Sequence, residues 1–463
     1  MQTFLFYDLE TTGLSKAFDQ VLQFAAIRTD KNLHEIERYE LKVKLNPDVI
    51  PSPHALITHH IGIHDAASGI SEYDAIRQIH RWMNQPGTIS LGYNTLGFDD
   101  EFLRFSFFRN LLPPYTHQYA NNCGRMDLYP MTIMYYLFKN HLIRWPTIED
   151  KISLKLELLN HANALAAGRA HDAMVDVEAT LQLAKYFHKE NEMWNYLAGH
   201  FNKTIDNQRA ELLQKNMALL FEGFLGAENK YHCPVLFIGQ HRHYKNQSLW
   251  LRLDMESLPE TTQETLTETT RMLNKKPGEP GFVLPMKERF LQHLTSERLK
   301  LAEYNHKWLE KNPGVLHAIT EHYLEYKHPV YPNTDVDASL YLTGFKNPVE
   351  ERFCQNFHAA NPKEKANMVE KIQNPAIRTQ AIRILGRHFP EVLTSKQAEE
   401  FNLYMAKIHP EEEDAMIDFQ NKKRLTPQTA LQQIDEIRKS KILSEEQQGL
   451  LTNLEHYLKR FKS

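Results

Sequence analysis

The chain has 463 residues and a formal net charge of −4 at pH 7, with 42% hydrophobic and 24% charged residues. This length predicts two or three domains, and the composition is typical of a soluble globular protein. The sequence contains no apolar run long enough to cross a bilayer, no signal peptide, and no C-x-x-C motif among its three cysteines. These features argue against a membrane protein, a disulfide-rich secreted protein and a zinc ribbon, and we expect a cytoplasmic location.

An apolar run near the N-terminus predicts a strand that ends in two carboxylates. The run FLFYDLETTG covers residues 4–13, and it places Asp8 and Glu10 one residue apart. Side chains alternate along a strand, so both carboxylates project from the same face. Two like charges this close repel each other unless a cation lies between them, and their hard oxygens suit Mg²⁺ or Mn²⁺. Taken alone, the pattern more often marks a buried strand that ends in two solvated acids.

Strand and helix patterns alternate from here to about residue 190. We expect further strands over 21–28, 37–43 and 88–94, the first two closing an antiparallel meander, and a helix over 73–83. Another helix should open at Asp99 and Asp100, where the helix dipole favours acids.

The window 102–126 contains no acid. It holds Arg104 among aromatic residues that include Tyr115 and Tyr119. Cations interleaved with aromatic rings suit single-stranded nucleic acid, because phosphates need charge and unstacked bases need flat apolar partners. The alternative is a helix whose phenylalanines form core and whose arginines are solvated.

A late helix should start near Asp172, which can cap it. Asp176 would lie in the first turns of this helix, and His171 in the loop just before it. By itself this pair carries little information, since a hydrogen-bonded histidine beside a helical aspartate is common. Lys155 and Arg169 are near in sequence and could hold phosphates.

The order of these motifs resembles the DEDDh exonuclease family, whose fold is ribonuclease H-like. The motifs that carry the resemblance are FLFYDLETTG, QFAAIRTD, LGYNTLGFDDE and AHDAMVDVEAT. The likeness is strongest over residues 1–190, and a three-domain bacterial member of the family is similar in order and length over the rest. It implies an α/β ribonuclease H-like domain over 1–191, with a mixed sheet flanked by helices. An SH3-like β domain over 192–334 and an all-helical domain over 335–463 would follow.

Phosphodiester hydrolysis needs an activated water and a stabilised leaving oxygen, which two divalent ions roughly 3.5–4 Å apart supply. We assign two Mg²⁺ ions, with Mn²⁺ as a substitute, to the metal ligands Asp8, Glu10, Asp99 and Asp176. Asp100 competes with Asp99, and the match to the family motif favours Asp99. His171 is the expected general base, because imidazole accepts protons near neutral pH. The expected catalytic set is these five residues, and the expected substrate contacts are Glu10, Lys155, Arg104, Tyr115, Tyr119 and Arg169.

Two downstream stretches also lack acids. Residues 233–253 read as a hairpin with Arg242 and Lys245 in a basic turn, and the alternative to a DNA contact is a solvated turn. Residues 371–390 lie in the helical part and carry four cations, Lys371, Arg378, Arg383 and Arg387.

The resemblance implies 3′→5′ removal of 5′-mononucleotides from single-stranded DNA, a role in DNA repair or recombination, and a monomer. It also implies that the helical domain docks the acidic C-terminal tail of single-stranded DNA-binding protein, for which 371–390 is the candidate. One alternative is a 3′→5′ exoribonuclease of the same family, although such small enzymes need no additions beyond residue 190. Another is a catalytically silent single-stranded nucleic-acid-binding protein, against which the presence of all five acid and base positions argues.

Overall fold

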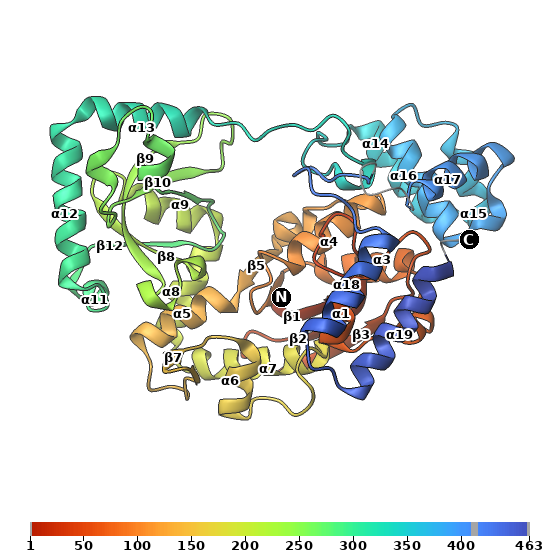
Figure 1. Cartoon of the computed structure of the whole chain (residues 1–463), viewed down its shortest axis with the longest axis horizontal. Coiled ribbons are helices and arrows are strands. Elements are labelled where there is room, and N and C mark those ends of the chain that lie inside the picture. Colours follow the sequence, from red (N-terminus) through yellow and green to blue (C-terminus); the bar gives the residue numbers. More distant parts are fainter. Residues whose placement is uncertain (1, 409–414, 461–463) are drawn as a thin grey trace.

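The computed structural model describes residues 2–408 and 415–460, which form three groups of elements. Figure 1 shows the first group in the centre, a second sheet with long helices on one side of it, and a helical group on the other side. An extended segment after α13 (Pro313–Glu325) runs from the second group to the helical group. No helix among the described residues is long and apolar enough to cross a membrane.

The first group is built on a mixed five-stranded sheet in the order β3-β2-β1-β4-β5. Strands β1, β2 and β3 form an antiparallel meander, whereas β4 and β5 run parallel to β1. The strands are β1 (Thr3–Thr11), β2 (Val21–Thr29), β3 (Glu35–Lys42), β4 (Thr88–Gly92) and β5 (Gly124–Asp127). The helices are α1 (Pro53–His59), α2 (Ile63–Ala67), α3 (Glu72–Met83), α4 (Asp99–Arg109), α5 (Leu128–Phe138), α6 (Leu156–Asn163) and α7 (Ala173–His188), and a small hairpin pairs β6 (Thr147–Ile148) with β7 (Lys151–Ile152).

Alternate side chains of β1 pack into two hydrophobic cores, one on each face of the sheet. Leu5 and Tyr7 pack with residues of α3 and α4 on one face. Phe4 and Phe6 pack with residues of α5 and α7 on the other face. The expected α/β class and the sheet flanked by helices are therefore confirmed. Because side chains alternate along β1, one face of the strand packs against α3 and α4 and the other against α5 and α7.

The second group contains a fully antiparallel sheet in the order β11-β10-β9-β8-β12. The hairpin expected over 233–253 is present as β9 and β10. Phe221 of β8 and Phe282 of β12 belong to the same buried cluster as Phe6 of the first sheet, so the two groups share a core. The elements are α8 (Asn191–Ala198), α9 (Lys203–Glu211), β8 (Met217–Phe221), β9 (His232–Gln240), β10 (Ser248–Arg252), α10 (Leu266–Thr269), β11 (Met272–Lys275), β12 (Phe282–Pro285), α11 (Glu288–Leu291), α12 (Ser296–Lys311) and α13.

The third group is helical throughout its described residues, apart from isolated bridges at Ile417. Two of its helices, α18 and α19, pack against α1 of the first group, where Leu56 and Ile57 join Ala430, Leu451 and Leu454 in one buried cluster. The helices are α14 (Pro348–Ala359), α15 (Pro362–Val369), α16 (Pro375–His388), α17 (Ser395–Ala406), α18 (Pro427–Ser440) and α19 (Glu445–Lys459). The expected boundaries at 191 and 334, and the SH3-like assignment of the second group, stay predictions.

Candidate active site

The end of β1 places two carboxylates on the face of the sheet that α7 covers. Asp8 and Glu10 share the parity of Phe4 and Phe6, and therefore their face. The register with β2 shifts between Glu10 and Thr11, so regular pairing ends just after the second carboxylate. Regular backbone pairing of β1 with β2 therefore ends beside the two acidic side chains.

Two helices begin at the same place and add two more carboxylates. Asp99 is the first residue of α4 and is buried, and Asp176 lies in the first turn of α7. Helix N-termini carry partial positive charge, which favours acids at these positions. All four acidic side chains and His171 line a single cleft of about 790 Å³. The four expected metal ligands and the expected base are therefore brought together.

The four carboxylates disfavour one another's ionisation. Burial, together with Asp176 and Asp99, raises the pKa of Glu10 to about 9. Burial, with the charge of Asp99, raises the pKa of Asp8 well above its ordinary value. Burial likewise raises the pKa of Asp99 to about 8 and that of Asp176 to about 6. The ionised forms of these four acids therefore need a bound positive charge, such as a metal cation, to balance them.

The donor set fits a hard divalent cation. One ligand atom each from Glu10, His171 and Asp176 lie within 4.8 Å of one another, which is close enough to share an ion. Carboxylate oxygens are the ligands that Mg²⁺ and Mn²⁺ prefer, and they greatly outnumber the single imidazole here. The residues present therefore fit a divalent metal centre.

His171 occupies a strained loop position beside this set. Its backbone adopts a left-handed conformation with φ 63°, and its N–H donates to Oδ2 of Asp176 over 3.3 Å. The imidazole is half-exposed, and its Nε2 lies 3.5 Å from Oε2 of Glu157. Asp172 caps α7 as expected, accepting from the backbone N–H of Met174. An exposed imidazole on a loop can approach a water in the cleft.

Asp100 has a different task from its neighbour. It is fully buried, and it contacts Arg125 at 2.6 Å, His117 at 2.8 Å and Arg104 at 2.9 Å. Burial alone would raise the pKa of Asp100, but Arg125 and Arg104 hold it well below its ordinary value. Asp100 is thus the centre of a buried ion cluster, whereas Asp99 lines the cleft.

The aromatic and basic window after α4 contributes less to the cleft than to this cluster. Arg104 is buried, pairs with Asp100 and Glu101, and lies over the ring of Tyr115 at 5.6 Å. Tyr119 is exposed. None of the three expected contacts, Arg104, Tyr115 and Tyr119, lines the cleft, and their role in substrate binding stays a prediction.

The other expected contacts surround the loop that carries His171. Lys155 is exposed, with its Nζ 3.9 Å from Oε1 of Glu157. Arg169 is half-exposed and pairs with Glu446 of α19 at 3.0 Å. Glu10 lies in the cleft itself. The roles of these three residues as substrate contacts also stay predictions.

Several residues of the cleft are absent from the predicted set. Leu14 lines it with 82% of its surface exposed, which is unusual for a leucine. His59 is buried, with Nε2 3.2 Å from the carbonyl of Thr11, and burial lowers its pKa to about 4. Part of the wall comes from the helical group, namely Ala415, Lys423, Arg424, Leu425, Thr426, Thr429 and Gln433. Sequence patterns identify the basic run at 422–424 but give no indication that it meets residues 8–14.

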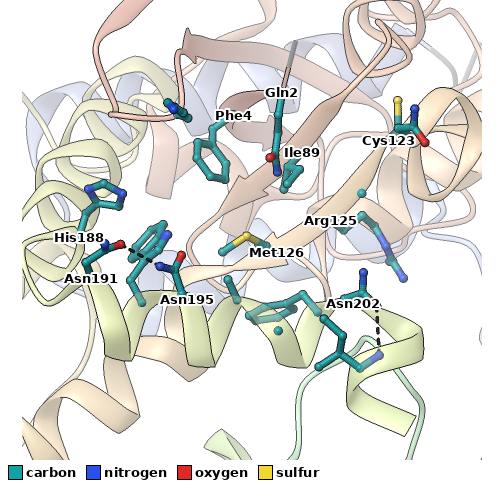
Figure 2. Close-up of a pocket in the computed structure, with 18 of the residues that line it drawn as sticks. Gln2, Phe4, Ile89, Cys123, Arg125, Met126, His188, Asn191, Asn195 and Asn202 are labelled. Atoms are coloured by element: carbon teal, nitrogen blue, oxygen red, sulfur yellow. Dashed lines mark hydrogen bonds between the residues drawn. The ribbon is translucent and has the colours of Figure 1, made fainter. Parts of the chain in front are cut away.

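A second hollow, of about 830 Å³, lies at the opposite end of the first sheet. Figure 2 shows it between the starts of β1, β4 and β5 and the helices α8 and α9, with Phe4, Ile89 and Met126 among the residues that line it. Its polar groups are mainly amides, and Asn195 donates to Asn191 across 2.9 Å. None of the described residues that line it is a carboxylate, so the acidic cleft is the better candidate for chemistry.

Comparison with known proteins gives two domain assignments. The model of the Exonuclease family matches residues 5–184, and that of the Exonuclease I C-terminal domain matches residues 334–461. Exodeoxyribonuclease I of Escherichia coli K12 is 29% identical over 413 residues, which cover 84% of this chain and 86% of that protein.

Solved structures give the same result for the fold. E. coli exonuclease I in complex with a dA16 oligonucleotide superimposes with a TM-score of 0.85 over 99% of this chain and 100% of that one, at 24% identity. The zinc-bound form of the E. coli complex with single-stranded DNA gives a TM-score of 0.87 over 100% of both chains, also at 24% identity. The chain thus combines a domain of the Exonuclease family, whose four carboxylates meet at one cleft, with a following Exonuclease I C-terminal domain.

Proposed function

We propose that this protein is a divalent-metal-dependent exodeoxyribonuclease that removes 5′-mononucleotides from the 3′ end of single-stranded DNA. The observation that carries the proposal is the convergence of Asp8, Glu10, Asp99, Asp176 and His171 on one cleft. The names of the relatives support the substrate class, because the E. coli enzyme is an exodeoxyribonuclease and has been solved with single-stranded DNA.

Asp8, Glu10, Asp99 and Asp176 would hold two Mg²⁺ ions, and Mn²⁺ would substitute. When bound, the ions lower the pKa of a water and stabilise charge on the leaving oxygen. The zinc-bound form of the E. coli complex is in line with a divalent-cation site in this family. Ionisation of the four acids and binding of cations are coupled, since each acid with a raised pKa gives up its proton more readily once positive charge is near.

His171 would accept the proton of the attacking water at its imidazole. The water oxygen forms a bond to phosphorus, the bond from phosphorus to the 3′ oxygen of the preceding nucleotide breaks, and that oxygen takes up a proton. The products are a 5′-mononucleotide and a strand with a new 3′-hydroxyl. Asp176 also orients this step, because it accepts the backbone N–H of His171 and so holds the loop beside the cleft.

Leu14 offers an apolar surface for the terminal base at the mouth of the cleft. Apolar contact of this kind favours an unstacked end over a base-paired one, because a paired base has no free face. Lys423 and Arg424 of the helical group line the same cleft and add positive charge that suits the phosphate backbone, and Arg424 also pairs with Asp48.

Digestion of a 5′-labelled single strand, read as product length over time, tests the proposal. We expect a ladder that shortens from the 3′ end with Mg²⁺ and no products with EDTA. Asp8→Ala and Asp176→Ala should abolish the ladder while DNA binding remains. A matched RNA strand separates the exoribonuclease alternative, and undiminished turnover in either variant would refute the site assignment.

We also propose a cytoplasmic monomer with a role in DNA repair, whose helical group docks the acidic tail of single-stranded DNA-binding protein. Within the candidate stretch 371–390, Arg383 and Arg387 are buried against Asp335, Asp337 and Asp48, and Arg378 pairs with Glu370 and Glu400. Of the four cations in this described stretch, only Lys371 is exposed and forms no ion pair with a described carboxylate. Anisotropy of a labelled acidic peptide should therefore respond to Lys371→Glu, and light scattering tests the monomer.

A further inference from the structure

Glu446, at the start of α19, reaches from the helical group to two parts of the exonuclease domain. Its Oε1 accepts from Nη1 of Arg169 at 3.0 Å and from Nη2 at 3.3 Å. Its Oε2 lies 3.1 Å from Nδ1 of His60. One carboxylate thus joins the segment just after α1 to the loop that carries His171.

The end of α19 that bears Glu446 is itself firmly docked. Ser444 and Gln447 form a capping box, in which each side chain accepts the backbone N–H of the other residue. The Gln447 amide also donates to the carbonyl of Ile57 at 3.0 Å. Leu450 lies so close to Gly62 that an added Cβ there would be 3.0 Å from it. The start of α19, which carries Glu446, is therefore held in place against α1 and the segment that follows α1.

The loop that it contacts has little regular structure to hold it. Residues 165–172 lie between α6 and α7, and two of them, Gly168 at φ 138° and His171 at φ 63°, adopt conformations that L side chains rarely occupy. Glycine adopts such a conformation freely, but that of His171 persists only where the surroundings impose it. The loop is restrained by the bond of His171 to Asp176 in α7 and by contacts with Glu157 and Asn160 in α6. From the helical group it is restrained by the ion pair of Arg169 with Glu446.

We propose that Glu446 is a positioning residue for the nuclease reaction. It holds Arg169, and through Arg169 it keeps the His171 loop in the geometry that the proton transfer requires. The proposal rests on the proposed function, since positioning matters only if His171 acts in the cleft. It also makes the helical group part of the catalytic apparatus, in addition to any role in binding DNA.

A competing arrangement makes the opposite prediction. Arg169 could serve as a phosphate contact that Glu446 merely neutralises in the absence of DNA. Removing the charge of Glu446 would then free Arg169, lower KM and leave kcat unchanged or raise it. Under the positioning role, removing either partner lowers kcat and leaves KM nearly unchanged.

A double-mutant cycle with Glu446→Gln, Arg169→Gln and the double variant separates the two. Both side chains are half-exposed, so all variants should fold, and thermal unfolding checks this. We expect each single variant to lower kcat on oligo-dT with Mg²⁺ by about three- to tenfold, and the double variant to lower it no further. Glu445→Gln is the matched control, because the adjacent Glu445 is exposed and forms no ion pair with any described residue.

Hydrogen exchange of the amides over 165–171 gives a readout independent of turnover. Faster exchange in Glu446→Gln and Arg169→Gln, but not in Glu445→Gln, is expected. Unchanged kcat and exchange in Glu446→Gln, a lowered KM, or additive effects of the two substitutions would each overturn the proposal. If the unaltered chain released no nucleotides with Mg²⁺, the proposed function would fail, and the exchange measurement would still decide whether Glu446 restrains the loop.

Discussion

The backbone N–H of His171 donates to Oδ2 of Asp176 across 3.3 Å. The carboxylate expected to hold a cation therefore also fixes the loop that carries the expected base. Asn retains an acceptor oxygen at this position but has no charge, whereas Ala lacks both. The two substitutions consequently separate the electrostatic task of Asp176 from its structural task.

We expect Asp176→Asn and Asp176→Ala to lose metal-dependent turnover equally, by about a thousandfold or more, because both remove a charged ligand. Only Asp176→Ala should speed hydrogen exchange at the amide of His171. Single-turnover rates and exchange mass spectrometry check these outcomes. Substantial turnover in Asp176→Asn would show that its charge is dispensable.

Replacing His171 tests the base directly. His171→Ala should lower kcat by about 10²–10⁴-fold, the usual contribution of general base catalysis, and should flatten the acidic limb of the pH–rate profile. His161→Ala is a suitable control, because His161 is an exposed residue of α6 and does not line the cleft. An unchanged pH–rate profile in His171→Ala would rule out the assigned role.

The raised pKa values predict how stability depends on pH without metal. In the folded protein, burial and neighbouring acids raise the pKa of Glu10 to about 9 and burial raises that of Asp99 to about 8, whereas unfolded carboxyl groups titrate near about 4. The folded state thus binds these protons more tightly, so their stabilisation is present at low pH and is lost as the pH rises through the folded values. Buried His59 and His80, whose pKa burial lowers to about 4, are neutral in this range.

In EDTA the Tm should accordingly fall between about pH 7 and about pH 9. Glu10→Gln should flatten this fall, because an amide needs no proton to remain neutral, and excess Mg²⁺ should restore the Tm of the unaltered chain but not that of the variant. Differential scanning calorimetry at several pH values provides the comparison. Identical curves for the two proteins in EDTA would contradict the assigned charge repulsion.

Leu14 predicts an effect on substrate binding without an effect on folding. Leu14→Ala should raise KM for single-stranded DNA by about five- to thirtyfold, because burying a leucine side chain against a base contributes about 1–2 kcal/mol. Its Tm should not change, since 82% of Leu14 is exposed. Leu212→Ala is the matched control, because Leu212 is 80% exposed and does not line the cleft. Equal KM values for the two variants would remove Leu14 from the substrate site.

The exonuclease domain and the helical group are joined by buried charges. Asp48 accepts from Arg387 at 2.7 Å, and Arg387 also contacts Asp337 at 2.7 Å. Burial alone would raise the pKa of Asp48, but Arg387 and Arg424 hold it well below its ordinary value. Arg387→Met should therefore destabilise the protein by about 3–5 kcal/mol, because it removes one of the two cations that balance the buried charge of Asp48.

Urea unfolding followed by fluorescence measures this cost. Arg378→Met offers a comparison, because Arg378 pairs with Glu370 and Glu400 near the surface and its loss should cost about 1 kcal/mol or less. Equal midpoints for the two variants would show that the buried cluster does not join the groups.

The local features of the site were predictable from sequence because they depend on short-range geometry. Alternation along β1 is enough to put Asp8 and Glu10 on one face, and the capping preference of Asp172 is enough to start α7 three residues before Asp176. The choice of Asp99 over Asp100 required the family motif. Both acids open the same helix, and only the buried partners Arg104 and Arg125 show which of them turns inward.

The contribution of the helical group to the cleft could not be predicted. Arg424 lines the same cleft as Leu14 although the two lie about four hundred residues apart in the chain, and no pattern in either segment specifies the other. The same is true of Glu446, whose neighbours in sequence suggest only an exposed helix start. Such contacts follow from how α18 and α19 pack on α1, which depends on the whole buried cluster.

The central claim is that four carboxylates from three separate elements share divalent cations at the site of cleavage. Mn²⁺ binding, followed by electron paramagnetic resonance with a non-hydrolysable single strand present, tests it most directly. The account predicts two ions bound per unaltered chain and weakened binding of at least one of them in Asp8→Asn, together with loss of turnover on cleavable DNA. Two ions bound with unchanged affinity in Asp8→Asn, or turnover that persists in that variant, would contradict it.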